Sequence, residues 1–150
     1  MRILIQRVQR ASVEIDGQVV SSIGQGYCLL VGFTHGDNEA IVNKMLDKLL
    51  KLRLFADSEG KTNLSLLDIG GEVLSVSQFT LYASLSSGNR PSFTDAMNAA
   101  EASALYEKFF DLLKQRHPKT QGGVFQTDMK VSILNDGPFT VMMDSKEICK

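Results

Sequence analysis

The chain has 150 residues, of which 43% are hydrophobic and 22% are charged, and its formal net charge is −1. These values are typical of one globular domain, expected over residues 1–150, that needs no metal or disulfide to hold its core. A charge this close to zero argues against a general nucleic-acid coat protein, although it allows a local basic patch on one face.

The opening residues indicate strands and not a targeting or membrane segment. Residues 2–15 and 18–24 predict two strands joined at Asp16-Gly17, a strong hairpin signal. Residues 26–33 are apolar almost throughout, which is typical of a strand covered on both faces. No stretch approaches the roughly 18 apolar residues of a membrane helix, and the two cysteines lack the pattern of a disulfide framework. We therefore expect a cytoplasmic protein that makes no membrane contact.

The middle of the chain predicts the first helix and two further strands. Asp37 is the expected N-cap, and apolar residues recur at helical spacing from residue 41 to residue 50. A short strand is expected at 52–56 and a longer one at 72–82.

The second half predicts a long helix and two closing strands. Thr94 is the expected cap of a helix over about residues 95–116. Residues 124–134 and 139–144 are the last two expected strands, separated by an Asn-Asp-Gly-Pro turn. Strands dominate this order, so we expect an α/β fold of mixed, β-rich type. Sheet should pack on sheet with the two helices packed outside, a β2-(βα)2-β3-like arrangement.

Signatures of metal, nucleotide and serine-hydrolase chemistry are missing from the sequence. His35, His117 and the two cysteines are scattered, without the spacing of paired metal ligands. The glycine pairs lack the context of a phosphate-binding loop, and no GxSxG elbow occurs. We expect no metal and no cofactor.

Two polar segments at the ends of apolar strands are the best candidates for a site. One is Ser77–Leu81, after the apolar run 72–76, and the other is Asn135–Thr140, after 129–134. Each taken alone is explained as a turn that ends its strand. Ser77 or Thr80 would act as a nucleophile only with a base to take its proton, and no histidine or lysine is implied by the spacing. Backbone N–H donors around Gln78, Phe79 and Thr80 are an alternative source of catalysis.

Together the two segments resemble the D-aminoacyl-tRNA deacylase family, which carries an SQFTL stretch and an N-x-G-P-x-T stretch in the same order. The likeness runs nearly end to end and includes Arg90-Pro91-Ser92-Phe93. The resemblance implies a homodimeric, cofactor-free hydrolase that binds aminoacyl-tRNA. Its reaction is hydrolysis of the ester between a D-amino acid, or glycine, and the 3′-terminal ribose of tRNA, a proofreading step in translation quality control.

The resemblance also implies a role for each site residue. The Gly-Pro bond is expected to be cis and to reach into the partner subunit's pocket, where it excludes L-amino acids. Phe125 is expected near the terminal adenine. At the scissile ester, the expected catalytic residues are Ser77, Gln78, Phe79 and Thr80. The expected substrate-binding residues are Phe125, Asn135, Gly137, Pro138 and Thr140.

Several points stay open at this level. The resemblance allows two mechanisms. Either Thr80 is the nucleophile, or the 2′-hydroxyl of the tRNA acts together with backbone donors. The second is favoured because no base is evident for Thr80. The chain has Gln126-Thr127 near the pocket where the family often has Gly-Ala. A dimeric binding module for an amino-acid-like ligand and a small-molecule esterase are the competing functions. The residues considered for attracting tRNA are Arg7, Lys51, Arg53, Lys61 and Arg90.

Overall fold

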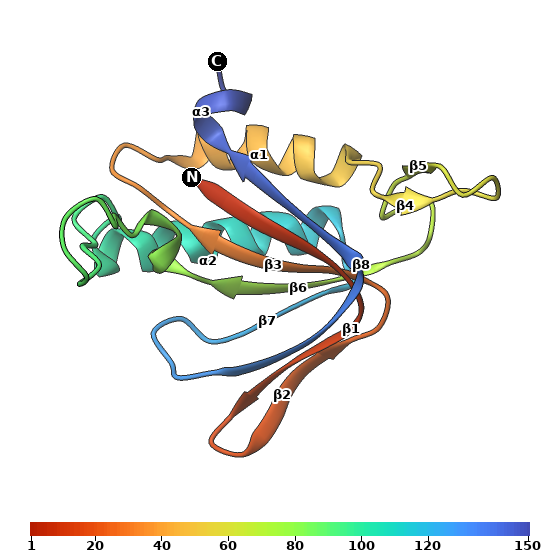
Figure 1. The fold of residues 1–150 in the computed structure, drawn as a ribbon, viewed down its shortest axis with the longest axis horizontal. Helices are drawn as coiled ribbons and strands as arrows, with labels where there is room; N and C mark the ends of the chain where they lie inside the picture. The colour runs from red at the N-terminus through yellow and green to blue at the C-terminus, as the bar shows by residue number, and fades with distance from the viewer.

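The computed structural model describes residues 1–150 and is organised around one long strand, β1 (Arg2–Ile15). One edge of β1 pairs first with β3 (Gly26–Gly32) and then, further along, with β2 (Gln18–Ile23). The other edge pairs with β8 (Lys130–Asp144), which runs antiparallel to β1 over nearly its whole length (Figure 1). Because β1 is bonded on both edges, it fixes the relative position of the first and last parts of the chain.

The sheet continues on the far side of β3 and then curls back. Strand β6 (Glu72–Ser77) lies parallel to β3, and β7 (Thr120–Gly122) lies parallel to β6. The Ser21 hydroxyl on β2 donates to the Gly122 carbonyl at 2.5 Å, and Gln121 Oε1 accepts from the Ser22 backbone N–H at 2.9 Å. These bonds bring β2 against β7, so the sheet is nearly closed into a barrel.

Two helices cover one face of this sheet. These are α1 (Glu39–Lys51) and α2 (Ala99–Arg116), and an ion pair of 2.8 Å between Asp47 and Arg116 joins them. Their buried sides and one sheet face form the larger core, which includes Ile5, Leu46 and Phe109. The remaining elements are the hairpin strands β4 (Phe55–Ala56) and β5 (Thr62–Leu64), the 3₁₀ helix η1 (Phe79–Tyr82), and the short helix α3 (Ser145–Ile148). None of the helices has the length and apolar character needed to span a membrane.

A second, smaller core lies on the opposite face of the sheet, inside the curl. Neighbouring residues of β3 alternate between the two cores: Tyr27 and Leu29 face the helices, whereas Cys28 lies in the smaller core. This confirms that residues 26–33 supply a strand covered on both faces. Burial raises the pKa of the Cys28 thiol to about 12, so this cysteine is an uncharged core residue.

The predicted strand-rich α/β architecture with helices outside is confirmed. The layers that face one another are parts of one curled sheet, because β1 is long enough to pair with β3 at one end and with β2 at the other. The hairpin at Asp16-Gly17 is also confirmed, and both residues have the positive φ (50° and 79°) that a two-residue hairpin turn favours.

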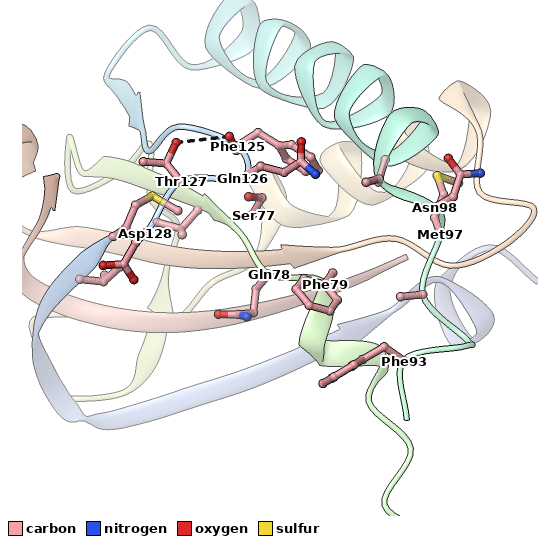
Figure 2. Close-up of a pocket in the computed structure, with 16 residues that line it drawn as sticks. Ser77, Gln78, Phe79, Phe93, Met97, Asn98, Phe125, Gln126, Thr127 and Asp128 are labelled. Atoms are coloured by element: carbon pink, nitrogen blue, oxygen red, sulfur yellow. Dashed lines mark hydrogen bonds between the residues drawn. The ribbon is translucent and has the colours of Figure 1, made fainter. Parts of the chain in front are cut away.

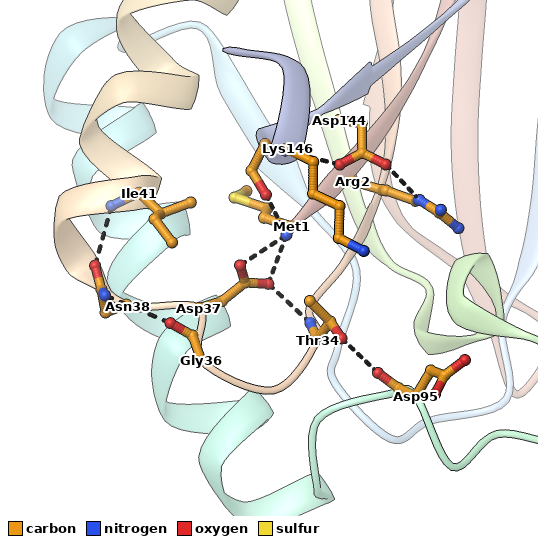
Figure 3. A network of polar contacts seen from close by, with 11 residues as sticks. Met1, Arg2, Thr34, Gly36, Asp37, Asn38, Ile41, Asp95, Asp144 and Lys146 are labelled. Atoms are coloured by element: carbon orange, nitrogen blue, oxygen red, sulfur yellow. Dashed lines mark hydrogen bonds and ion pairs between the residues drawn. The ribbon is translucent and has the colours of Figure 1, made fainter. Parts of the chain in front are cut away.

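Several expected boundaries are wrong, among them the strand expected at 52–56, which is reduced to Phe55–Ala56. Asn38 and not Asp37 caps α1, because Asp37 binds the buried amino group of Met1 at 2.6 Å instead (Figure 3). Asn98 and not Thr94 caps α2, with its side-chain oxygen 3.0 Å from the Glu101 N–H. The two strands expected at 124–134 and 139–144 are replaced by the single strand β8, because both sides of the Asn-Asp-Gly-Pro segment pair with β1.

Gly26 tests the pairing of β3 with β6, the strand that leads to the candidate site. A Cβ at this position would lie 1.8 Å from the Glu72 carbonyl oxygen, which is backbone and cannot turn aside. We expect Gly26→Ala to lower the free energy of unfolding by about 3 kcal/mol, the upper end of the usual cost of overpacking. Urea unfolding measures this change.

Gly60→Ala is the matched control, because Gly60 has φ +77° but nothing within 4 Å of an added Cβ. It should lose only the roughly 1 kcal/mol that a left-handed backbone costs an L-residue. Equal losses in the two variants would show that close approach of the strands does not matter at Gly26.

Candidate active site

The first polar segment begins where β6 ends. The Gln78 N–H donates to the Val31 carbonyl at 2.7 Å, and the chain then turns into η1. A Cβ on Gly32 would lie 2.7 Å from the Gln78 carbonyl oxygen, so η1 sits close to the end of β3 only because a glycine is there. The strand expected over 72–82 therefore stops at Ser77, and its continuation is helical.

A cavity of about 650 Å³ opens beside this turn. Its walls come from the end of β6, the start of α2 and the segment 125–129 that leads into β8 (Figure 2). This volume is in the range of small-molecule sites. The expected site residues Ser77, Gln78, Phe79 and Phe125 all line it.

Thr80 lies one residue beyond the lining, on η1. Its side chain is exposed, and its hydroxyl accepts a hydrogen bond of 2.5 Å from the Gln78 side-chain amide. No histidine, lysine or carboxylate is bonded to this hydroxyl. The Thr80 side chain therefore lacks the base that a nucleophilic hydroxyl requires.

The cavity is almost free of charge. Asp128 is the one ionisable side chain in the lining, and it is exposed and paired with Lys130 at 2.9 Å. Behind the wall, the Tyr106 hydroxyl bonds to both the hydroxyl and the carbonyl of Ser75 at 3.0 Å. Burial raises the pKa of Tyr106 to about 12, so this group is a neutral support that holds α2 against β6.

Metal chemistry has no donor set in the structure. Nowhere do three histidine, cysteine, aspartate or glutamate side chains come together as a group that would hold an ion. His117, which the sequence leaves as a scattered candidate, is buried, and its Nε2 lies 2.8 Å from the Gly71 carbonyl oxygen. This histidine therefore supports the end of α2.

The second polar segment forms a bulge in β8. Gln6 pairs with Thr140 and Val8 with Asn135, so the single residue Arg7 faces the four residues 136–139. The Gly137–Pro138 bond in this bulge is cis, as the family resemblance implies. Four expected substrate-binding residues of this segment have exposed side chains or backbone: Asn135, Gly137, Pro138 and Thr140.

Arg7 holds the bulge in place. Its Nε donates to the Asp136 carbonyl at 2.9 Å, and its Nη1 donates to the Leu54 carbonyl at 2.7 Å. Its guanidinium also lies over the Phe139 ring, 4.6 Å from the centroid. The Arg7 side chain is only 15% exposed, and its guanidinium is occupied by these contacts. Arg7 is therefore poorly placed to attract tRNA.

The bulge and the cavity do not meet within the chain. Arg7 pairs with Tyr27, and Tyr27 pairs with Val73, so the bulge lies level with the first half of β6. The cavity begins at Val76, near the other end of β6, and no residue of the segment 135–140 lines it. Strands β1 and β3 separate the two features.

Some cavity residues carry no site signal in the sequence. Met97 and Asn98 enter through the start of α2, and Phe93 enters through the loop before it. Gln126 and Thr127 complete the wall near Phe125. Met97 and Asn98 are ordinary apolar and amide side chains that no motif singled out, whereas the family likeness had pointed to Phe93 through the stretch Arg90–Phe93 and to Gln126-Thr127 as residues near the pocket.

A family model and two curated relatives match nearly the whole chain. The family model for D-Tyr-tRNA(Tyr) deacylase matches residues 4–144. The D-aminoacyl-tRNA deacylase of Lactobacillus acidophilus is 51% identical over 144 residues, covering 96% of this chain and 99% of that protein. The D-aminoacyl-tRNA deacylase of Bacillus velezensis is 48% identical over 147 residues, covering 98% of this chain and 100% of that protein.

Solved structures show the same fold. The c-Myc DNA Unwinding Element Binding Protein superposes with a TM-score of 0.91 at 39% identity, covering 96% of this chain and 98% of that chain. A structure described as a "probable eukaryotic D-amino acid tRNA deacylase" gives a TM-score of 0.82 at 17% identity, covering 95% and 97%.

Gln126 offers a test of the cavity wall. Its φ of 57° lies in the left-handed region, where an L-residue costs roughly 1–2 kcal/mol and glycine costs none. We expect Gln126→Gly to raise the free energy of unfolding by up to about 1 kcal/mol, after the added freedom of the unfolded chain is subtracted.

Thr127→Gly is the control, because Thr127 is not among the residues with positive φ. This variant should be less stable than the parent in the same urea titration. A Gln126→Gly protein that is destabilised as much as Thr127→Gly would contradict a backbone cost at position 126.

Proposed function

The chain belongs to the D-Tyr-tRNA(Tyr) deacylase family, and we propose that it hydrolyses the ester between a D-amino acid, or glycine, and the 3′-terminal ribose of tRNA. The observation that carries the proposal is the cavity lined by Ser77, Gln78, Phe79 and Phe125, in which Asp128 is the one ionisable side chain. Residues 1–150 act as one catalytic domain in this proposal, and the enzyme acts in the cytoplasm, where charged tRNA is used.

An uncharged cavity suits a reaction that relies on positioned backbone donors. The first N–H groups of a helix have no acceptor within that helix, and Phe79 and Thr80 hold these positions in η1. Donors of this kind stabilise the negative charge that develops on an ester oxygen when water attacks the carbonyl carbon. The bond to the ribose 3′-oxygen then breaks, giving the free amino acid and tRNA with its terminal hydroxyl restored.

The attacking water must also lose a proton, and we assign the group that assists this transfer to the substrate. Thr80 has only an amide as its neighbour, and Asp128 is turned to solvent with Lys130. The 2′-hydroxyl beside the ester is therefore the group we propose to assist the attack. Phe125 supplies the apolar surface for the terminal adenine, with Tyr106 packed 6.0 Å behind it.

Selection against L-amino acids is assigned to the exposed bulge at Gly137-Pro138. Since this segment does not reach the cavity of its own chain, we propose a homodimer in which it enters the cavity of the partner subunit. In a symmetric pair, each subunit would place its bulge in the cavity of the other subunit. Arg7 ties the Asp136 carbonyl of the bulge to the Leu54 carbonyl outside it, and a rigid wall is what rejection by steric clash requires.

The direct test compares D-Tyr-tRNA, L-Tyr-tRNA and Gly-tRNA with one purified protein. The proposal requires turnover of the first and third and little of the second. Binding without turnover would favour a binding module, and equal turnover of simple amino-acid esters would favour a small-molecule esterase. Sedimentation that shows only a 16.5 kDa species at micromolar concentration would contradict the homodimer.

Thr80→Ala should keep its activity on D-Tyr-tRNA within about tenfold of the parent, because only one hydrogen bond to Gln78 is lost. A tRNA that ends in 2′-deoxyadenosine should react about 10²–10⁴-fold more slowly, the usual contribution of a positioned proton-transfer group. Single-turnover hydrolysis measures both rates. An inactive Thr80→Ala protein, with normal cleavage of the 2′-deoxy substrate by the parent, would make Thr80 the nucleophile.

Arg7→Lys should reduce the preference for D- over L-Tyr-tRNA by about tenfold or more. Lysine keeps the charge, but its single ammonium cannot bind the Asp136 and Leu54 carbonyls in the fixed fork of arginine. The ratio of kcat/KM for the two substrates measures the change. Arg10→Lys, on an exposed position of the same strand, is the matched control. A protein that loses stability but keeps its full preference would show that the bulge does not select.

A further inference from the structure

Two exposed phenylalanines stand together at the cavity. Phe79 and Phe93 are 54% and 41% exposed, and their rings meet edge to face with centroids 5.1 Å apart. Both line the cavity, and Figure 2 shows Phe93 beyond Phe79, on the side away from Phe125. An aromatic pair that stays in water at the mouth of a site presents a ring surface to a ligand.

A loop closed at its base carries an exposed cation and leads directly into one of these rings. Ser84 and Ser92 exchange backbone hydrogen bonds of 2.8 and 3.0 Å, which fix the base of the loop between them. Phe93 follows directly, so its position is set by this closure. Arg90 lies in the loop, exposed, and takes part in none of the salt bridges.

We propose that Phe79, Phe93 and Arg90 bind the single-stranded nucleotide that precedes the terminal nucleoside of the tRNA substrate. The base stacks on the Phe93 ring, and the phosphate that joins the two nucleotides lies near Arg90. Stacking aromatics beside a cation are the usual means of holding single-stranded nucleic acid. The inference rests on the proposed function, since it assumes a tRNA end in the cavity.

A nucleotide fits this surface better than a protein does. Apart from Leu85, which is 73% exposed, the exposed residues of the loop before Arg90 are small and polar, Ser86, Ser87, Gly88 and Asn89, and these four offer little apolar area to a protein partner. The ring pair is also continuous with the cavity, so a strand whose last nucleoside enters the cavity has to pass it. The overall charge of −1 leaves the attraction of the backbone to local cations such as Arg90.

The test compares two minimal substrates, 3′-(D-tyrosyl)adenosine and the D-tyrosyl ester of the dinucleotide cytidylyl-adenosine. The parent protein should have a higher kcat/KM on the dinucleotide, mainly through a lower KM. Phe93→Ala should remove about 5- to 150-fold of this gain, the usual effect of deleting a stacking ring. Phe93→Tyr keeps the ring and should keep the gain, whereas Phe93→Leu keeps the volume and should lose it.

A salt titration with D-Tyr-tRNA tests the cation separately. Arg90→Gln should make the log-log dependence of binding on salt shallower by about 0.7, the value for one single-strand phosphate contact. Arg90→Lys should keep the slope. Lys48→Gln is the control, because Lys48 lies in the last turn of α1, whose end faces β4 and not η1 (Figure 1).

Different outcomes would refute the proposed function and the stacking site. A parent protein that hydrolyses neither minimal substrate nor D-Tyr-tRNA would refute the proposed function itself. An active parent with no gain from the second nucleotide would refute the stacking site alone. Equal losses of Phe93→Ala on both substrates, with or without a change in sedimentation, would assign Phe93 to the cavity or to a subunit contact and would also refute it.

Discussion

The pairing of β1 with β8 is the constraint from which both candidate features of this protein follow. The two strands are in register at Gln6 and Thr140 and again at Val8 and Asn135, which leaves Arg7 opposite four residues. A ladder bonded on both sides of such an excess cannot absorb it, so the extra residues project outward. Arg7 then fills the gap and donates to the Asp136 carbonyl of the bulge, while its Nη1 ties the bulge to the Leu54 carbonyl ahead of β4. The exposed bulge is thus a product of the sheet and does not depend on a loop.

The cavity depends on the same sheet, but at the place where β6 ends. β6 is bonded between β3 and β7, and it ends where Gly32 lets η1 approach closely. The buried contact between Tyr106 and Ser75 sets α2 against β6 behind the wall. Ser77 and Gln78, which line the cavity, therefore stand at the end of a strand that is hydrogen-bonded on both edges. This arrangement suits chemistry that depends on position more than on titratable side chains.

Sequence reasoning succeeded where local pattern decides the outcome. Alternation and apolar runs predicted β1, β2 and β3, and helical spacing predicted α1 and α2, because each pattern reports which face is buried. It failed at Asp37, whose carboxylate is taken by the amino group of Met1, 36 residues away in the chain. It also failed at the Asn-Asp-Gly-Pro segment, where turn residues sit inside a continuous strand. The SQFTL motif and the family resemblance pointed to Ser77–Phe79 and Phe125, which line one cavity. The Gly-Pro segment, expected in the partner's pocket, lies apart from the cavity of its own chain.

The partners in the longest ladder of this sheet lie at opposite ends of the chain. Arg2 pairs with Asp144 and Glu14 with Lys130, so one edge of β1 has no neighbour until the ribosome has made almost the whole protein. Contacts this distant in sequence form late and slow the completion of a fold. Until then, an apolar strand with an open edge can pair with other chains. A chain that stops before residue 130 would therefore display the edge of β1 that β8 conceals in the finished protein.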